Sequence, residues 1–311
     1  MKTSIHKFKQ EVPKESLVKR YYCPLCEAPD FKECFEIQSI GNVLMNECDR
    51  CQLKFVSHIP TPMYLERYYD SQFSEYFEAF NPGSGKKVTF GKESRFAKHL
   101  SRRLSGRLPD TANFRILDFG GGDGSLAYAF ADNFVLNSTT VVSITCCDYV
   151  SDLVQSNNPN IALVHIPDLK QVDTRFDLII ASASLEHTPN PGEIIERFDS
   201  ILAPGGLIYI RTNYISPFIG ISKKIDFSFP AHLEEFNPES LHFFLESNAP
   251  GLKIVEIRPA IVELSFMSHP IFHLISRLFK FPGVLENIIF GKVSKLRWPL
   301  VGAFEVLITK S

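Results

Sequence analysis

From about residue 111 onward, the chain alternates short apolar runs with stretches of helical pattern. The runs are nearly continuous in hydrophobic character, which is typical of strands buried on both faces of a sheet. They comprise residues 114–119, 141–147, 161–166, 176–181, 206–210, 252–257 and 304–309. Between them, apolar residues recur at helical spacing, as at Leu126, Phe130 and Phe134. The alternation predicts a doubly wound α/β domain over residues 111–311.

Three regions of different character precede this domain. Residues 1–20 are polar and basic, and they predict an arm. Residues 21–60 carry paired cysteines among short β-prone pieces, which indicates a small separate module. Residues 61–110 have a helical pattern and predict a connector or cap. A mixed apolar and basic stretch at about 265–300 interrupts the α/β pattern and predicts a cap insertion over the sheet.

Composition and charge narrow the class of protein. The chain has 311 residues, of which 44% are hydrophobic and 22% are charged, as in an ordinary soluble globular protein. Its formal net charge of -2 provides no overall attraction for nucleic acid or for anionic membranes. The first twenty residues lack the apolar stretch of a secretory signal, and no apolar run approaches the length of a membrane span. We therefore expect a cytoplasmic protein without a transmembrane segment.

Four of the seven cysteines form two CxxC pairs. Cys23 and Cys26 are separated from Cys48 and Cys51 by twenty-one residues, a spacing that is typical of a zinc ribbon. Four thiolates complete a tetrahedral site without an open position, so the predicted zinc is structural. A redox CxxC pair or inert core cysteines are the alternatives. Cys34 has no partner at ligand spacing, and we expect it to pack in the core.

A glycine-rich turn follows the first predicted strand of the α/β domain. Gly120, Gly122 and Gly124 form a GxGxG pattern, and Asp118 precedes it by two positions. Glycines at a strand-to-helix turn let the backbone approach a ligand closely. A dinucleotide site would have GxGxxG, and its pyrophosphate would be repelled by so near a carboxylate. The pattern therefore favours a ligand with a cationic end and no phosphate.

With these residues, the segment resembles the first motif of the class I methyltransferases, DxGxGxG. The segments FDLIIASASLEHTPNP and LAPGGLIYI are similar to two later stretches of the same family, and the resemblance extends over about residues 111–311. It implies a Rossmann-like sheet of seven strands with helices on both faces, and S-adenosylmethionine as methyl donor. It also implies that Asp148, at the end of the second strand, binds the ribose hydroxyls, and that Asp168 lies near the adenine.

The same resemblance indicates the acceptor side of the site. Glu186 and His187 follow the fourth strand, at the edge of the sheet where ligands of open α/β folds bind. His187 is the first candidate for the general base and His232 the second, with structural roles for either histidine as the alternative. Some ubiquinone-type relatives bind a divalent cation through a glutamate three residues before the Glu-His pair. This chain has Ala183 there, so the sequence predicts no metal at this point.

A ribbon followed by a methyltransferase domain resembles enzymes of bacterial surface polysaccharide and deoxysugar pathways. The resemblance implies O-methylation of a sugar or another small-molecule precursor, on a nucleotide- or lipid-linked acceptor. The basic stretch 86–107 would then attract a phosphate or form a solvated helix face, and the insertion at 265–300 would make shallow membrane contact. An RNA base methyltransferase, a sugar C-methyltransferase and an inactive binding module remain as alternatives. Because residues 21–60 are not basic, nucleic acid is not the expected partner.

Overall fold

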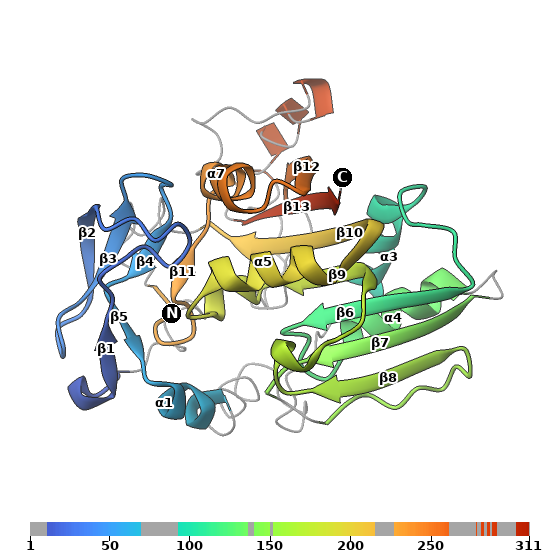
Figure 1. Ribbon diagram of the computed structural model, residues 1–311, viewed down its shortest axis with the longest axis horizontal. Coiled ribbons are helices and arrows are strands. Elements are labelled where there is room, and N and C mark those ends of the chain that lie inside the picture. The colour runs from blue at the N-terminus through green and yellow to red at the C-terminus, as the bar shows by residue number, and fades with distance from the viewer. Residues whose placement is uncertain are drawn as a thin grey trace.

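The computed structural model describes most of the chain in six ranges. These are residues 11–69, 93–135, 140–149, 152–214, 227–260 and 303–310, with short helical pieces at 278, 281–282, 285–286 and 288–290. Figure 1 shows a small antiparallel sheet beside a large twisted sheet that helices flank.

The large sheet has seven strands in the order β12-β13-β10-β9-β6-β7-β8. Its strands are β6 (Asn113–Phe119), β7 (Val141–Cys147), β8 (Ile161–Ile166), β9 (Phe176–Ser182), β10 (Leu202–Asn213), β12 (Leu252–Pro259) and β13 (Ala303–Lys310). The five strands from β10 to β8 are parallel, whereas β13 is antiparallel to both of its neighbours. Each of the seven predicted apolar runs is a strand, and the predicted fold class is confirmed.

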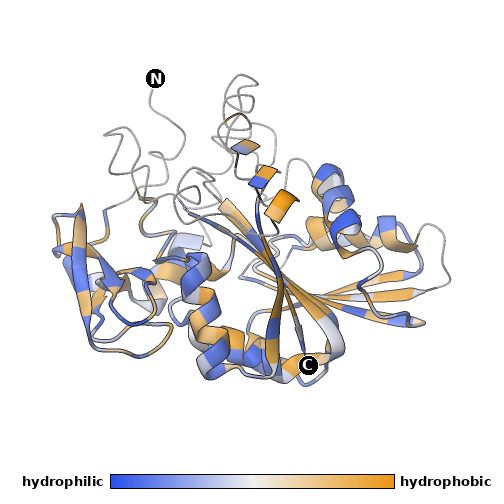
Figure 2. Cartoon of the chain, turned by 90° about the horizontal axis from the view of Figure 1, so that it is seen from above, coloured by the Kyte–Doolittle hydropathy of each residue, from blue (hydrophilic) through white to orange (hydrophobic). Residues whose placement is uncertain are grey.

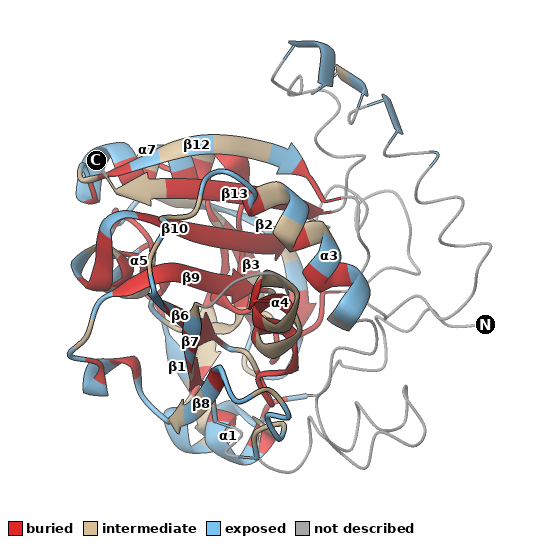
Figure 3. Ribbon diagram, turned by 90° about the vertical axis from the view of Figure 1, so that its right-hand side faces the viewer, coloured by how far each residue is buried: buried red, intermediate tan, exposed pale blue. Residues whose placement is uncertain are grey.

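Helices cover both faces of this sheet (Figures 1 and 3). On one face lie α3 (Glu93–Leu104) and α4 (Ser125–Val135), and on the other α5 (Pro191–Ile201) and α7 (Pro238–Asn248). Two separate apolar clusters result, because neighbouring side chains of each strand point to opposite faces. All seven residues of β9 are buried, and the strands in the centre of Figure 2 are mostly hydrophobic. Each fully buried large apolar side chain stabilises the fold by about 1.5–3 kcal/mol.

The small sheet contains the predicted ribbon and one strand from the large domain. Its order is β11-β4-β3-β2, formed by β2 (Phe31–Gln38), β3 (Val43–Cys48), β4 (Lys54–Val56) and β11 (Glu234–Glu235). The pairing of β11 with β4 joins two segments that are far apart in the sequence. The ribbon is therefore attached to the loop that precedes α7.

The segments expected as arm, connector and cap are described in part. Residues 14–19 form the 3-10 turn η2 (Lys14–Ser16) and strand β1 (Leu17–Lys19), which pairs with β5 (His58–Pro60), and residues 1–10 lie outside the description. In the connector, α1 (Pro62–Arg67) and α3 are described and residues 70–92 are not. Of the cap insertion, only the short helical pieces are described. Within these described ranges, no helix is both long and apolar enough to cross a membrane.

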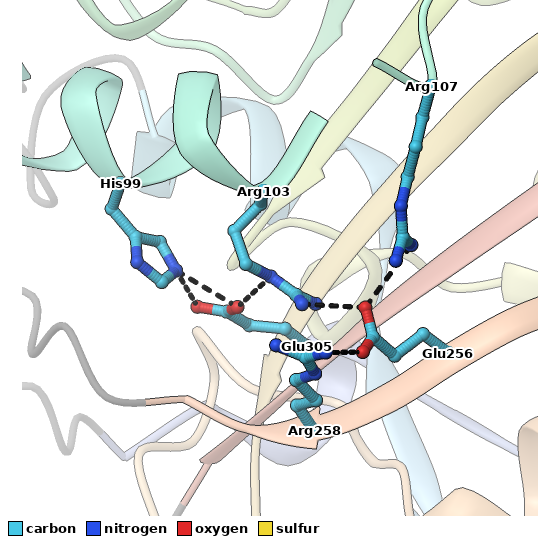
Figure 4. A network of polar contacts seen from close by, with 6 residues as sticks. All are labelled: His99, Arg103, Arg107, Glu256, Arg258 and Glu305. Atoms are coloured by element: carbon cyan, nitrogen blue, oxygen red, sulfur yellow. Dashed lines mark hydrogen bonds and ion pairs between the residues drawn. The ribbon is translucent and has the colours of Figure 1, made fainter. Parts of the chain in front are cut away.

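Part of the basic stretch 86–107 is used to hold α3 on the sheet. Arg103 makes ion pairs with Glu256 of β12 at 2.6 Å and with Glu305 of β13 at 3.4 Å, and its side chain is buried. His99 lies 3.0 Å from Glu305, and Arg107 lies 3.3 Å from Glu256 (Figure 4). His99 and Arg103 are thus engaged by carboxylates of the sheet, whereas Arg107 is exposed and pairs with Glu256 at the surface.

Candidate active site and metal centre

The glycine turn lies between β6 and α4, as the sequence predicts. Gly120, Gly122 and Gly124 all have positive φ angles, between 58° and 76°, which side chains other than glycine rarely adopt. At Gly120, a Cβ atom would lie 2.4 Å from the Cβ of Ser184, two residues after the end of β9. The turn therefore contacts the segment that carries the Glu-His pair.

Asp118 is buried beneath this turn. A Cβ atom on Gly121 would lie 2.4 Å from the Asp118 carboxylate, so the backbone packs directly over it. Burial, and then the charge of Asp148, raises the pKa of Asp118 to about 7. Its Oδ2 atom has no hydrogen-bond partner in the described structure. Such a carboxylate fits a cationic ligand group, and the S-adenosylmethionine ammonium is one.

Asp123 occupies the start of α4, where a dinucleotide fold would bind phosphate. Its side chain accepts a hydrogen bond from the Ser125 backbone N–H at 3.0 Å, and Asp123 is buried. A carboxylate at the positive end of a helix already satisfies the donors that a phosphate would use. This agrees with a ligand that lacks phosphate. The sequence analysis did not single out Asp123, although a Gly-Asp-Gly-Ser segment at a helix start indicates a cap.

The two remaining acidic residues predicted for the cofactor lie near the ends of adjacent strands. Asp148 follows β7 and accepts a hydrogen bond from the Gly122 backbone N–H at 2.8 Å. The His165 ring donates from Nε2 to the Asp148 carbonyl oxygen at 2.7 Å. Asp168 is exposed and accepts from the Lys170 backbone N–H at the start of η4 (Leu169–Gln171). Asp148 is thus part of the turn, whereas Asp168 lies at the margin of the site.

The Glu-His pair sits on the short turn η5 (Leu185–His187), immediately after β9. The chain enters this turn through Ala183, whose φ of 56° is strained for a residue with a side chain. The Ala183 N–H donates to the Arg211 carbonyl oxygen at 2.7 Å, which holds the strained residue against β10. This arrangement brings Glu186 and His187 to the same sheet edge as the glycine turn.

His232 approaches the pair from a different part of the chain. The ring centroids of His187 and His232 are 4.8 Å apart, and the Leu233 N–H donates to the Glu186 carbonyl oxygen at 2.8 Å. Burial, and then the neighbouring His187 ring, keeps the pKa of His232 well below its usual range. The three residues predicted for the acceptor side are therefore neighbours in space.

Tyr69 joins this group from the end of α1. Its hydroxyl lies 3.3 Å from His187 Nδ1 and donates to the Ala231 carbonyl oxygen at 3.2 Å. Its ring stacks on Tyr149, with centroids 5.6 Å apart. From the sequence, Tyr69 is only a residue of the helical connector predicted over 61–110, because no local pattern marks a contact so distant along the chain.

The four predicted metal ligands of the ribbon converge at one point. The Sγ atoms of Cys23 and Cys51 are 3.5 Å apart, those of Cys26 and Cys48 are 3.6 Å apart, and all four lie within 4.8 Å of one another. Sulfur ligands of a tetrahedral zinc ion, with bonds of about 2.3 Å, lie about 3.8 Å apart. All four side chains are buried, so the cluster fits a closed structural site. Cys34, expected in the core, is exposed instead.

The two CxxC turns have the same backbone geometry. Glu27 and Gln52, each directly after the second cysteine of its pair, have φ angles of 58° and 61°. Each donates its N–H to the carbonyl oxygen of the first cysteine in its pair, at 2.9 Å in both cases. This repetition is what two metal-binding turns need in order to present their sulfurs to one ion.

Several polar contacts join the ribbon to the loop that carries His232. Arg20 makes a buried ion pair with Glu234 at 2.6 Å. The Val56 N–H donates to the Leu233 carbonyl oxygen at 3.0 Å, and the Asn237 side chain donates to the Gln52 carbonyl oxygen at 2.7 Å. The ribbon thus supports the acceptor side of the site, while the glycine turn belongs to the large sheet alone.

Solved structures of methyltransferases have a similar arrangement of elements. Magnesium protoporphyrin IX methyltransferase from Synechocystis with bound SAH is 15% identical, with a TM-score of 0.47, over 80% of this chain and 99% of that one. Coclaurine N-methyltransferase bound to N-methylheliamine and SAH is 16% identical, with a TM-score of 0.46, over 78% of this chain and 82% of that one. A Haloferax volcanii methyltransferase complex with the Trm112 activator is 12% identical, with a TM-score of 0.44 and coverages of 79% and 96%. Similarities of this size say nothing about the substrate.

Family membership rests on the sequence match. The family model described as a methyltransferase domain matches residues 90–256, which is more than half of the chain. A comparison with curated proteins gave no significant match. The matched residues include the glycine turn, both acidic strand ends and the Glu-His pair. The chain therefore belongs to the methyltransferase-domain family and is an S-adenosylmethionine-dependent methyltransferase.

Proposed function

We propose that the protein methylates a hydroxyl oxygen of a sugar, or of a similar small precursor of a surface polysaccharide. The observation that carries this proposal is the contact between the glycine turn and the segment leading to Glu186 and His187. The turn that would bind the methyl donor thereby lies next to the segment of the Glu-His pair, and two imidazole rings lie 4.8 Å apart there. Methyl transfer to oxygen needs a proton acceptor, and an imidazole is suited to that role near neutral pH.

On the donor side, each acidic residue would bind a different part of the cofactor. The Asp118 carboxylate would hold the ammonium group, Asp148 the ribose hydroxyls, and Asp168 would border the adenine. Gly120, Gly122 and Gly124 leave the space for the cofactor to approach the backbone. When bound, S-adenosylmethionine supplies a methyl group made electrophilic by the sulfonium.

On the acceptor side, His187 is our candidate for the base. Its Nδ1 lies 2.6 Å from the Ala231 carbonyl oxygen, a contact that requires a hydrogen on Nδ1. The Nε2 atom then carries the lone pair and would accept the hydroxyl proton. Glu186 and His232 would orient the acceptor, and His232 is the second candidate for the base.

Two features support an acceptor on a precursor carrier. Residues of the described helical pieces between 278 and 290 expose large apolar side chains, which favours shallow contact with a membrane that holds a lipid-linked sugar. These are Leu278, Phe281, Leu285, Ile288, Ile289 and Phe290. The ribbon, with zinc in its cysteine cluster, would act as a support for the acceptor loop and not as a nucleic-acid module, since the chain carries a net charge of -2.

The test is methyl transfer from labelled S-adenosylmethionine to a panel of nucleotide-linked and lipid-linked sugars. We expect turnover with at least one hydroxyl acceptor, and a loss of at least a hundredfold in His187→Ala. His242→Ala provides the matched control, because His242 is exposed on α7 and its ion pair is with Glu246, one helical turn away. Transfer to RNA that persists in 200 mM salt, with none to any sugar, would overturn the proposal.

A further inference from the structure

The acceptor-side residues have the composition of a metal site. Glu186, His187 and His232 each present one donor atom, and these three atoms lie within 4.8 Å of one another. Two ligands on opposite sides of an ion with bonds of about 2.1 Å are about 4.2 Å apart. Three atoms 4.8 Å apart lie about 2.8 Å from their common centre, so side-chain shifts of about 0.7 Å would bring all three onto one ion.

The buried Glu186 carboxylate indicates a cation-binding group independently of this clustering. The residue is only 1% exposed, and neither of its carboxylate oxygens has a hydrogen-bond partner in the described structure. A buried, ionised carboxylate without partners is strongly destabilising, because it has lost its water without compensation. A bound divalent ion between Glu186 and the two imidazoles would satisfy the carboxylate.

The surroundings of His187 fit the same role. Its Nδ1 faces the Ala231 carbonyl oxygen at 2.6 Å, and the Tyr69 hydroxyl lies 3.3 Å from the same nitrogen. Metal-binding histidines in proteins usually donate one ring N–H to a carbonyl or carboxylate, which fixes the ring and leaves the other nitrogen for the ion. The two contacts from Ala231 and Tyr69 are of this kind.

We propose that Glu186, His187 and His232 bind a divalent first-row transition ion that holds the acceptor hydroxyl. Two imidazoles and one carboxylate select ions such as Mn²⁺, Fe²⁺ or Zn²⁺ over Mg²⁺, which prefers oxygen ligands throughout. Three protein ligands leave positions open, in contrast to the closed cysteine cluster of the ribbon. An acceptor with a hydroxyl group can occupy an open position directly.

The ion would supply the means of deprotonating the acceptor in the proposed function, on which this inference rests. A metal-bound hydroxyl is far more acidic than a free one, so its O–H bond breaks near neutral pH and the proton passes to solvent water. The oxygen keeps the electron pair and forms the new bond to the methyl carbon. As that bond forms, the bond from the cofactor's sulfonium to the methyl carbon breaks, and the sulfur keeps its electron pair as a neutral thioether. In the loaded protein the two histidines are therefore ligands, and the ion replaces imidazole as the means of deprotonation.

The test is titration of the full-length protein, with its ribbon zinc retained, with Mn²⁺ followed by electron paramagnetic resonance. Mn²⁺ is chosen because thiolate clusters bind it poorly, so it leaves the ribbon unchanged. We expect one Mn²⁺ per chain, and binding at least tenfold weaker in Glu186→Gln and in His232→Ala. Glu186→Gln keeps the side-chain volume and removes the buried charge, so the fold is retained. His242→Ala and Glu246→Gln, on the exposed face of α7, are the matched controls and should bind as the unmodified chain does.

The outcomes separate the metal site from the methyl transfer itself. No Mn²⁺ binding, or equal binding in Glu186→Gln, overturns the metal site even where His187-dependent turnover survives chelation. Specific Mn²⁺ binding with no methylation of any hydroxyl acceptor keeps the site and refutes the proposed function. Specific binding, with turnover of the zinc-loaded protein that depends on added Mn²⁺, supports both.

Discussion

At the scale of single residues, the donor site depends on one buried acid. Asp118 lies under the glycine turn with a pKa raised to about 7, mainly by burial and further by Asp148 and Asp123. The folded chain therefore holds the Asp118 proton more tightly than the unfolded chain, where the pKa is about 3.9. The contribution of this group to stability is fullest at low pH and is lost as the pH rises from about 4 to about 7.

Cofactor affinity should follow the opposite trend. Only the ionised Asp118 attracts the ammonium group, so we expect the affinity for S-adenosylmethionine to rise about tenfold between pH 6 and pH 8. Calorimetric titration at several pH values measures this directly. Asp118→Asn should bind more weakly and lose the dependence on pH, and a flat profile in the unmodified chain would argue against this role.

Gly120 tests the close contact between the two halves of the site. Gly120→Ala places a Cβ atom 2.4 Å from the Ser184 Cβ at a φ of 67°, whereas Gly205→Ala has a similar φ of 73° and no neighbour within 4 Å. The control should lose about 1 kcal/mol of unfolding free energy from backbone strain alone. The Gly120 variant should lose at least about 2 kcal/mol, with cofactor binding lost as well. Equal losses in chemical denaturation would contradict the proposed contact.

At the scale of elements, the decisive pairing is that of β11 with β4. It attaches the loop that carries His232 to the ribbon, and the buried ion pair of Arg20 with Glu234 stabilises this junction. Removing one member of a buried ion pair is costly, because the other member stays buried without its partner. A second effect limits this cost, since burial raises the pKa of Glu234 to about 8 and lets it take up a proton.

Arg20→Met tests how much the ion pair at this junction contributes to the unfolding free energy. We expect a loss of about 2 kcal/mol in unfolding free energy near pH 8, and a smaller loss at pH 6, where Glu234 is protonated. Methyl transfer should decrease together with stability, because His232 loses its support. Lys19→Met, an exposed neighbour on β1, should change stability by less than about 0.5 kcal/mol. A loss in Arg20→Met that does not vary with pH would refute the role of Glu234.

At the scale of the whole molecule, the ribbon packs against the acceptor loop, α5 and one face of the large sheet, whereas the glycine turn is part of the sheet itself. Zinc removal by chelation, or Cys48→Ser, should therefore affect cofactor binding less than methyl transfer. We expect the cofactor affinity to change by about twofold at most and methyl transfer to fall by at least about tenfold, since the ribbon is hydrogen-bonded to the loop that carries His232. Equal loss of both in calorimetry and turnover assays would show that the ribbon supports the entire fold.

The exposed apolar helical pieces also belong to this scale. Phe281 and Ile288 are 60% and 73% exposed, and basic residues such as Lys280 and Lys292 lie near them in the sequence. We expect sedimentation with phosphatidylglycerol vesicles that weakens with added salt, and at least fivefold weaker binding by Phe281→Ser with Ile288→Ser. Val255→Ser, at an exposed position of β12, is the control. Equal binding to neutral phosphatidylcholine would exclude the electrostatic part of this contact.

Much of the molecule was determined by local sequence. The seven strands follow from apolar runs that can only be buried on two faces, and the boundaries of β7 and β8 agree with the predicted runs to the residue. The turn at Gly120 and the two cysteine pairs follow from backbone freedom and ligand spacing. These features depend on neighbours within a few positions, so a single sequence contains them.

The tertiary structure alone decided which distant residues meet. The sequence predicted no metal at the Glu-His pair, because Ala183 stands where some relatives have a metal-binding glutamate. Such a local motif contains no information about residues that approach from elsewhere in the chain. The folded chain brings His232 beside Glu186 instead, carries Tyr69 to the same place, and completes the ribbon with β11. Contacts between residues so far apart leave no periodicity or spacing in the sequence. They arise when the whole chain buries its apolar surface, and they form the acceptor side of the site.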